Sequence, residues 1–293
     1  MKWLLLGVNG QVGHEVHRYL STLGECLAPT RNELDLSKQD AVVRYLDEHK
    51  PELIINAAAY TAVDKAEEEV ELATALNATL PETLARYCAE NGLLLVHYSS
   101  DYVYPGNGET AWQEGDVTDP LSIYGQSKHA GDAAVLASGC DHLIFRTSWV
   151  YSARGHNFMK TMLRLGKDKE QLSIVGDQIG APTPARLIAE VTALAVQRFQ
   201  HERRVTGLYH LAPRGETSWH GFACEIFGQA QAQGVELAIS NERVASIPTS
   251  DYPTPATRPL NSRLNLSRIE QTFNIRLPDW REQLTLTLTE HLG

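Results

Sequence analysis

The chain has 293 residues, 43% of them hydrophobic, with 26 basic and 36 acidic residues and a formal net charge of −10. This length can bury a core and suggests two lobes, or one domain with a large insertion. The dispersed basic residues argue against nucleic-acid binding, and no segment approaches the roughly 18 apolar residues of a membrane span.

The cysteines, the histidines and the N-terminus point to a cytoplasmic protein. The four cysteines are far apart, and the eleven histidines show no metal-binding spacing. The apolar start around Leu4 to Leu6 is interrupted by Asn9 and Gln11 before a signal-peptide cleavage site could form. We therefore expect reduced thiols and no structural metal site.

A glycine-rich turn follows the first predicted strand, which covers Leu4 to Gly7. The turn reads GVNGQVG over residues 7–13, and apolar residues then recur at helical spacing. Glycines at such a turn let the backbone approach a pyrophosphate, which the helix N-terminus also attracts. The turn therefore predicts a dinucleotide site at Gly7, Gly10 and Gly13, with a purely structural turn as the alternative.

The second predicted strand, about Cys26 to Thr30, is followed by Arg31. An acidic residue near this point binds the ribose 2′-hydroxyl of NAD, whereas an arginine can bind the 2′-phosphate of NADP. Arg31 therefore favours NADPH over NADH, and a solvated surface arginine is the alternative. Asp35 and Leu36 follow and could reach the adenine.

Further strands alternate with helices. A strand over Leu53 to Ile55 leads into small residues where a flat ligand could lie, although helix packing would also explain them. The other elements expected in this half are helices at about 66–78 and 81–91, and strands over Leu93 to Val96 and Leu143 to Phe145. The alternation predicts an α/β fold with a doubly wound parallel sheet of the Rossmann type.

The expected chemistry depends on Ser100 and on a tyrosine and a lysine four residues apart, Tyr124 and Lys128. The two share one face of a helix, so the ammonium could lower the pKa of the phenol from its usual value of about 10. Such a tyrosine can donate the proton that completes a carbonyl reduction. Ser100 could hold the carbonyl oxygen. A lone Tyr-x-x-x-Lys match is weak, so the rest of the chain must support it.

The pattern is less regular after Trp149. Helices are expected near 156–167, 184–199, 218–232 and 278–291, with a strand over Gly207 to Leu211. The polar segment Pro253 to Asn265 is either a solvated connection or a loop that closes over an anionic substrate. We expect a dinucleotide-binding domain over residues 1–150, to which about 184–212 return, and a smaller α/β substrate-binding lobe mainly over 151–293.

Five segments together resemble the extended short-chain dehydrogenase/reductases, and more narrowly the dTDP-4-dehydrorhamnose reductase family. They are NAAAYTAVDKAE (56–67), HYSSDYVYPG (97–106), FRTSWVY (145–151), GAPT (180–183) and PTPATRPLNSRL (253–264). The resemblance implies hydride transfer from NADPH or NADH to C4 of dTDP-4-dehydro-6-deoxy-L-mannose. The product would be dTDP-L-rhamnose, a donor for cell-surface polysaccharide such as lipopolysaccharide O-antigen.

The resemblance also implies roles for individual residues. Tyr124 would be the proton donor, with Lys128 providing electrostatic preorganisation and Ser100 replacing the threonine that is frequent in the family. The implied contacts to the sugar nucleotide are Ser100, Asp101 and Trp149. The implied cofactor contacts, from pyrophosphate to nicotinamide ribose, are Gly10, Gln11, Val12, Asp35, Leu36, Ala59, Tyr60, Thr61, Tyr98, Tyr124 and Lys128.

Some members of the family bind Mg²⁺ across a dimer interface through acidic residues. The resemblance places one of these at Glu15, but the second position holds Arg186, which cannot ligate Mg²⁺. Glu190, one helical turn further on, could substitute for it. The sequence therefore leaves both the Mg²⁺ bridge and a homodimer open.

Proteins with other functions share this predicted fold. Sugar-nucleotide 4,6-dehydratases typically carry an Asp-Glu pair where this chain has Asp101 followed by Tyr102, so dehydration is not expected. A 4-ketoreductase for another dTDP-sugar stays open. So does a non-catalytic NADP-binding regulatory subunit, which resembles a family member that modulates an adenosyltransferase.

Overall fold

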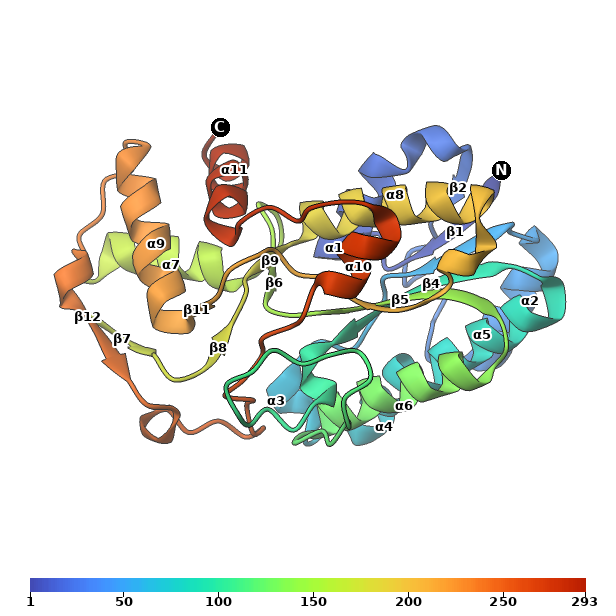
Figure 1. Ribbon diagram of the computed structural model, residues 1–293, viewed down its shortest axis with the longest axis horizontal. Helices are drawn as coiled ribbons and strands as arrows, with labels where there is room; N and C mark the ends of the chain where they lie inside the picture. Colours follow the sequence, from blue (N-terminus) through green and yellow to red (C-terminus); the bar gives the residue numbers. More distant parts are fainter.

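A six-stranded parallel sheet is the centre of the larger of two lobes, and the computed structural model describes residues 1–293 (Figure 1). The strand order is β10-β5-β4-β3-β1-β2, so the winding reverses between β1 and β3. This order confirms the predicted doubly wound α/β fold. The strands are β1 (Lys2–Leu6), β2 (Glu25–Leu27), β3 (Leu53–Asn56), β4 (Leu94–Ser100), β5 (Asp141–Thr147) and β10 (Gly207–His210).

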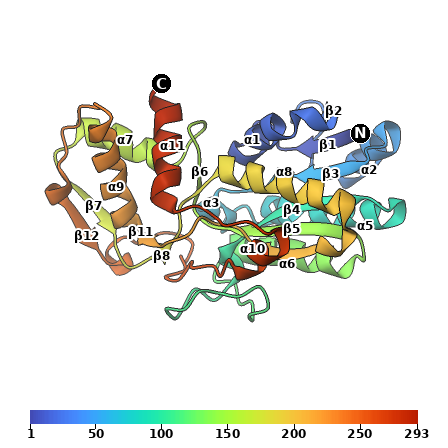
Figure 2. The same ribbon diagram turned by 45° about the horizontal axis from the view of Figure 1, so that its top comes forward.

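Side chains alternate between the two faces of each buried strand, and helices cover both faces (Figures 1 and 2). On β1, Trp3 and Leu5 belong to one apolar cluster, whereas Leu4 and Leu6 belong to another. The first face is covered by α1 (Gln11–Tyr19), α8 (Ala185–His201) and α10 (Ser267–Phe273). The second is covered by α2 (Gln39–His49), α5 (Leu80–Asn91) and α6 (Ile123–Ala137). Burial on both faces explains why these strands read as continuous apolar runs.

Two strands end elsewhere than the sequence predicted. β2 stops at Leu27, two residues before Pro29, which has no N–H for the ladder. β4 continues past Val96 as far as Ser100, because its last residue still pairs with Thr147 of β5. The polar residues at the end of β4 are therefore held by the sheet itself.

The helix predicted over 66–78 is wrong as a continuous element. The chain forms α3 (Val63–Ala66), α4 (Val70–Thr74) and a π-helical turn, η2 (Ala75–Thr79), that runs into α5. Pro81 cannot donate the bond that an α-helix would make to the carbonyl of Asn77, which favours the wider turn. That carbonyl instead lies against α6, where a Cβ on Gly131 would be only 2.1 Å from it.

The smaller lobe has three helices around one apolar cluster. α7 (Phe158–Asp168), α9 (Trp219–Ala232) and α11 (Trp280–Leu292) contribute to that cluster. A parallel pair that the sequence did not predict, β7 (Leu172–Val175) with β12 (Val244–Ile247), lies beside them. Figure 1 shows this lobe next to the sheet, with α8 reaching from one towards the other. Two short ladders complete the fold: β6 (Val150–Tyr151) with β9 (Thr183–Pro184), and β8 (Ile179–Gly180) with β11 (Thr217–Ser218).

The polar segment Pro253 to Asn265 is tied to both lobes, which overturns the idea of a solvated connection. Asn261 is 1% exposed, and its Nδ2 donates to the carbonyl oxygens of Asn107 and Thr110 at 3.1 and 2.7 Å. The next residue, Ser262, donates its backbone N–H to Ile179 in β8 at 2.7 Å. The segment thus has a fixed path over the carboxyl edge of the sheet. No helix combines the length and apolar character that crossing a membrane requires.

Candidate active site

The glycine turn connects β1 to the N-terminus of α1 by a very close approach of backbones. Gly7 has a φ of +83°, and a Cβ there would lie 2.7 Å from the backbone of Ala57. A Cβ on Gly13 would lie 2.1 Å from the carbonyl oxygen of Gly7. No side chain caps α1 at Gly10, so the N–H groups of Gln11 and Val12 have no capping partner. These features fit a pyrophosphate at the helix N-terminus.

The loop from Ala57 to Thr61 follows β3 at the same edge of the sheet, and Asn77 holds it. The Oδ1 of this fully buried asparagine accepts from the Tyr60 N–H at 2.8 Å, and its Nδ2 donates to the Tyr60 carbonyl at 3.0 Å. Nδ2 also lies 3.1 Å from Ser127 Oγ of α6. Asn77 therefore links the predicted cofactor contacts Ala59, Tyr60 and Thr61 to the helix of Tyr124.

We expect Asn77→Ala to lower the free energy of unfolding by about 2–3 kcal/mol, because it leaves both backbone groups of Tyr60 buried without a partner. Urea unfolding followed by circular dichroism measures this. Asn32→Ala, at an exposed position, is the matched control and should leave the midpoint unchanged. An Asn77→Ala protein as stable as the parent would show that the loop finds other partners.

Helix α6 brings the catalytic candidates together. It starts after Ser122, whose Oγ accepts from the N–H of Gly125 at 3.2 Å. Lys128 is 2% exposed and its Nζ donates to the carbonyl oxygen of Tyr98 at 2.6 Å. The hydroxyl of Ser100, at the end of β4, lies close enough to the Tyr124 phenol to lower its pKa. The three residues thus converge at the carboxyl edge of the sheet.

The predicted depression of the Tyr124 pKa is wrong. Burial raises the pKa of Tyr124 far above its usual value, against the opposing effect of the Ser100 hydroxyl. Burial also lowers the pKa of Lys128 to about 8. Burial disfavours the charged form of each group, and this loss of hydration is the largest cause of both shifts. A raised pKa keeps Tyr124 protonated at neutral pH, as a proton donor requires.

Asp101 lies in the short helix η3 (Asp101–Val103), directly after Ser100. Ser100 Oγ donates to Asp101 Oδ1 at 3.1 Å, and burial raises the pKa of Asp101 to about 6, while the hydroxyls of Ser262 and Ser100 act in the opposite direction. Next to it, the ring of Tyr102 meets the Tyr124 ring edge-on at 5.4 Å. The predicted substrate contacts Ser100 and Asp101 therefore adjoin Tyr124.

The segment Pro253 to Asn265 also reaches this place. Arg258 pairs with Asp64 at 2.7 Å and its Nη1 lies 3.4 Å from the hydroxyl of Tyr102. Arg258 was part of the possible anionic-substrate loop, and the structure brings it to the residue that packs on Tyr124.

Trp149, a predicted substrate contact, lies in the turn between β5 and β6. Its φ of +49° lies in the left-handed region that side chains rarely adopt. Its ring stacks on Trp219 with centroids 3.8 Å apart, and a Cβ on Gly180 would lie 3.0 Å from it. The glycine of the GAPT segment therefore makes room for the indole. Strain of this kind is commonly kept where a side chain has a functional position.

Tyr98 has a different surrounding from the one predicted. Its hydroxyl lies 2.9 Å from Thr192 Oγ1 of α8, and its ring stacks on Phe145 inside the core. What it presents to Lys128 is its backbone carbonyl. The phenol is therefore a core group, and the carbonyl is the part of Tyr98 that contacts Lys128.

The predicted adenosine contacts lie after β2. Arg31 is exposed and forms no ion pair. Asp35 Oδ1 accepts from the Ser37 hydroxyl at 2.7 Å, and Leu36 packs against the apolar cluster of the second face. The exposed guanidinium is free to meet a phosphate.

The residues considered for Mg²⁺ form no metal site within one chain. Glu15 is 2% exposed and pairs with Arg18 at 3.1 Å, and Arg186 donates to Gln283 at 3.0 Å. Glu190 is exposed, and no group of three or more His, Cys, Asp or Glu side chains could hold a metal. Arg186 cannot supply an oxygen ligand, so these positions within one chain do not provide the several oxygen contacts that Mg²⁺ needs.

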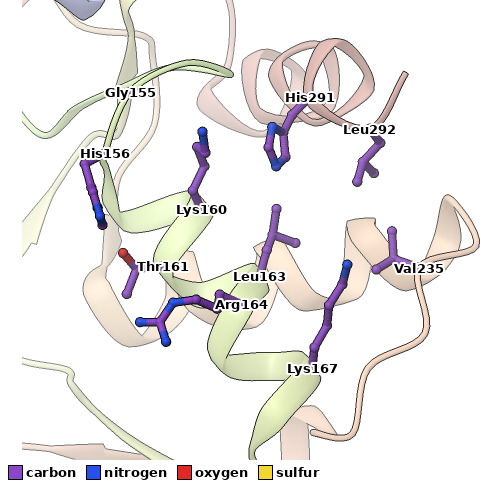
Figure 3. Close-up of a pocket in the computed structure, with 10 residues that line it drawn as sticks. All are labelled: Gly155, His156, Lys160, Thr161, Leu163, Arg164, Lys167, Val235, His291 and Leu292. Carbon is purple, nitrogen blue, oxygen red and sulfur yellow. The ribbon is translucent and has the colours of Figure 1, made fainter.

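A cavity of about 460 Å³ lies elsewhere, between α7 and the end of α11 (Figure 3). Its lining includes Lys160, Arg164, Lys167 and His291, and none of the predicted site residues. In Figure 3, Lys160 and Lys167 point towards the end of α11. This cavity is separate from the convergence of Tyr124, Lys128 and Ser100.

Sequence reasoning missed a buried polar chain behind Lys128. Asp132 accepts from Arg146 Nε at 2.9 Å, and Arg146 Nη1 donates to the hydroxyl of Tyr104 at 2.8 Å. That hydroxyl lies 2.6 Å from Nε2 of His210. Four polar residues so far apart in the chain carry no shared spacing. The one available signal was Asp132 itself, four residues after Lys128.

Comparisons with known proteins identify the family of the chain. The family model described as RmlD substrate binding domain matches residues 1–292. A dTDP-4-dehydrorhamnose reductase of Shigella flexneri is 46% identical over 294 residues, which cover 99% of this chain and 98% of that protein.

Solved structures give the same result. The structure of a dTDP-4-dehydrorhamnose reductase from Clostridium acetobutylicum is 35% identical, with a TM-score of 0.91 over 100% of both chains. That of a dTDP-4-dehydrorhamnose reductase from Bacillus anthracis in complex with NADP is 32% identical, with a TM-score of 0.88 over 99% of both chains. The chain therefore belongs to the dTDP-4-dehydrorhamnose reductase family.

Proposed function

We propose that this protein is the enzyme that reduces dTDP-4-dehydro-6-deoxy-L-mannose at C4 to dTDP-L-rhamnose, with NADPH or NADH as reductant. The observation that carries the proposal is the convergence of Tyr124, Ser100 and Lys128 at the sheet edge that also bears the glycine turn. The proposal is supported by 46% sequence identity, over nearly the full length of both chains, to the dTDP-4-dehydrorhamnose reductase of Shigella flexneri.

The nicotinamide cofactor supplies a hydride to C4 when bound. Ser100 and Tyr124 hold the carbonyl oxygen by hydrogen bonds, and the phenol gives it a proton as the hydride arrives at carbon. Lys128 places a positive charge beside the phenol and favours the phenolate that results. Asp101 and Trp149 contact the sugar nucleotide. The hydride and the proton thus reach opposite ends of one C=O bond.

The chain offers matching positions for each part of the cofactor. Gly7, Gly10, Gln11, Val12 and Gly13 would hold the pyrophosphate, and Asp35 and Leu36 the adenosine. Ala59, Tyr60 and Thr61 would contact the middle of the cofactor. Lys128, Tyr124 and the carbonyl of Tyr98 would lie at the nicotinamide ribose. A second carboxylate after Asp101 is absent, which disfavours a dehydratase.

The test is the loss of NADPH absorbance with enzymatically prepared dTDP-4-keto-6-deoxy sugars. We expect turnover with the L-mannose (rhamnose-type) ketone and far less with other dTDP-4-keto sugars. A preference for another ketone would identify a different 4-ketoreductase. Tight NADPH binding without turnover, while a known reductase consumes the same substrate, would favour the regulatory subunit.

We expect Arg31→Ala to weaken the binding of NADPH about tenfold while leaving NADH nearly unchanged, because only NADPH carries a 2′-phosphate for the exposed guanidinium. Fluorescence titration with both cofactors measures this. Arg86→Ala, another exposed arginine, is the control on overall charge. Equal weakening of both cofactors would refute the preference for NADPH.

We also propose a division of the chain into two lobes. Residues 1–150, with about 184–212, form the cofactor lobe, and the remainder of 151–293 the substrate lobe. The support is that β10 extends the sheet and α8 packs on it. We also propose a cytoplasmic location and a homodimer, and both proposals are based on family resemblance. Sedimentation velocity with and without a chelator tests whether any dimer needs a metal.

A further inference from the structure

A third residue shares the helix face of Tyr124 and Lys128. Asp132 follows Lys128 by four residues in α6, so the three side chains lie one above another. Asp132 is fully buried. Its Oδ2 accepts from Arg146 Nε at 2.9 Å, whereas Oδ1 has no hydrogen-bond donor and lies 3.9 Å from Nε2 of His97.

Charge balance around Lys128 depends on this carboxylate. His97 of β4 cannot help, because burial and the nearby Lys128 hold the pKa of its imidazole well below the usual range, so it is neutral. Arg146 of β5 is a second buried cation. On α6, the Tyr124 phenol is neutral because burial raises its pKa. The carboxylate of Asp101, in η3, acts on Tyr124. Asp132 is thus the buried carboxylate that pairs with Arg146 and lies one helical turn from Lys128.

Arg146 fixes the carboxylate from behind. Its guanidinium is 5.1 Å above the ring of Tyr104 and donates to that hydroxyl, which is held in turn by His210. Arg146 therefore cannot turn away from Asp132 without breaking this chain. The attraction within a buried ion pair often does not exceed the free energy of removing both charges from water. The Asp132–Arg146 pair is therefore weak evidence for a purely stabilising role.

We propose that Asp132 is a positioning residue for the reduction: its carboxylate, anchored by Arg146, keeps the buried ammonium of Lys128 charged beside Tyr124. This inference rests on the proposed function. The group acts through Lys128 and touches neither substrate nor cofactor.

The proposal has a signature in the pH dependence of turnover. Burial lowers the pKa of Lys128 to about 8, and the carboxylate of Asp132 acts against this change. Without that charge, Lys128 loses its proton at a lower pH. Asp132 also raises the pKa of Tyr124, so its loss shifts the phenol in the same direction. Both effects move the alkaline fall of kcat to lower pH.

The experiment compares kcat against pH for the parent protein, Asp132→Asn, Asp132→Ser and Asp132→Glu. The two neutral variants should move the alkaline limb down by about one pH unit or more and lower kcat at neutral pH about tenfold. Asp132→Glu should keep the limb of the parent. Asp141→Asn, which removes the carboxylate that pairs with the exposed Arg203, is the control that should change neither.

The outcomes separate the two claims. A parent protein that turns over none of the dTDP-4-keto sugars refutes the proposed function. An active parent whose neutral variants keep the same alkaline limb, even with a lower melting temperature, refutes the role of Asp132. The same holds if neither neutral variant folds while Asp132→Glu does, since the carboxylate would then be structural only.

Discussion

Tyr124→Phe is expected to lower kcat by about 10³-fold or more, within the range attributed to a positioned general acid. The substitution removes one hydroxyl and leaves a ring of the same shape against Tyr102. Because the phenol's task is proton donation, the affinity for NADPH should stay within a few-fold. Stopped-flow or steady-state absorbance gives kcat, and fluorescence titration gives the dissociation constant.

Tyr87→Phe is the matched control for that experiment. Tyr87 is a buried tyrosine of α5 whose hydroxyl donates to the carbonyl of Leu46 at 3.1 Å, away from Ser100 and Lys128. Its loss should cost some stability and no turnover. If Tyr124→Phe lost cofactor binding as severely as turnover, the phenol would be a structural or binding group instead of the acid.

Gly13→Ala should reduce the affinity for NADPH by about 100-fold, or about 2.7 kcal/mol. The added methyl group would lie 2.1 Å from the Gly7 carbonyl oxygen and 2.7 Å from its carbonyl carbon, far inside contact distance. Neither neighbour is a flexible side chain, so the turn must move away from α1. That movement displaces the N–H groups proposed to bind the pyrophosphate.

Gly115→Ala provides the control because a Cβ at that glycine would meet no atom within 4 Å. It should bind NADPH as the parent does. Circular dichroism of Gly13→Ala should show a folded protein, since the change is confined to one turn. Unaltered NADPH affinity in a folded Gly13→Ala protein would mean that the glycine turn is structural and the cofactor binds elsewhere.

The sequence predicted the fold well where a single chain segment carries its own pattern. The apolar runs of β1, β3 and β5 are buried on both faces, so hydrophobicity alone marks them. The turn after β1 was visible because only glycine tolerates the approach to Ala57. The helix over 66–78 was wrong because its break depends on Asn77 and Pro81, and on contacts with α6 that have no local signal.

The site residues divide in the same way. Tyr124, Lys128, Ser100 and the glycines follow from local spacing and from family motifs, since residues on one helix face or one turn are neighbours by geometry. The tertiary structure alone determined the protonation of Tyr124, the core position of the Tyr98 phenol and the chain from Asp132 to His210. Burial and contacts between distant segments control these properties, because the cost of dehydrating a charge depends on everything packed around it.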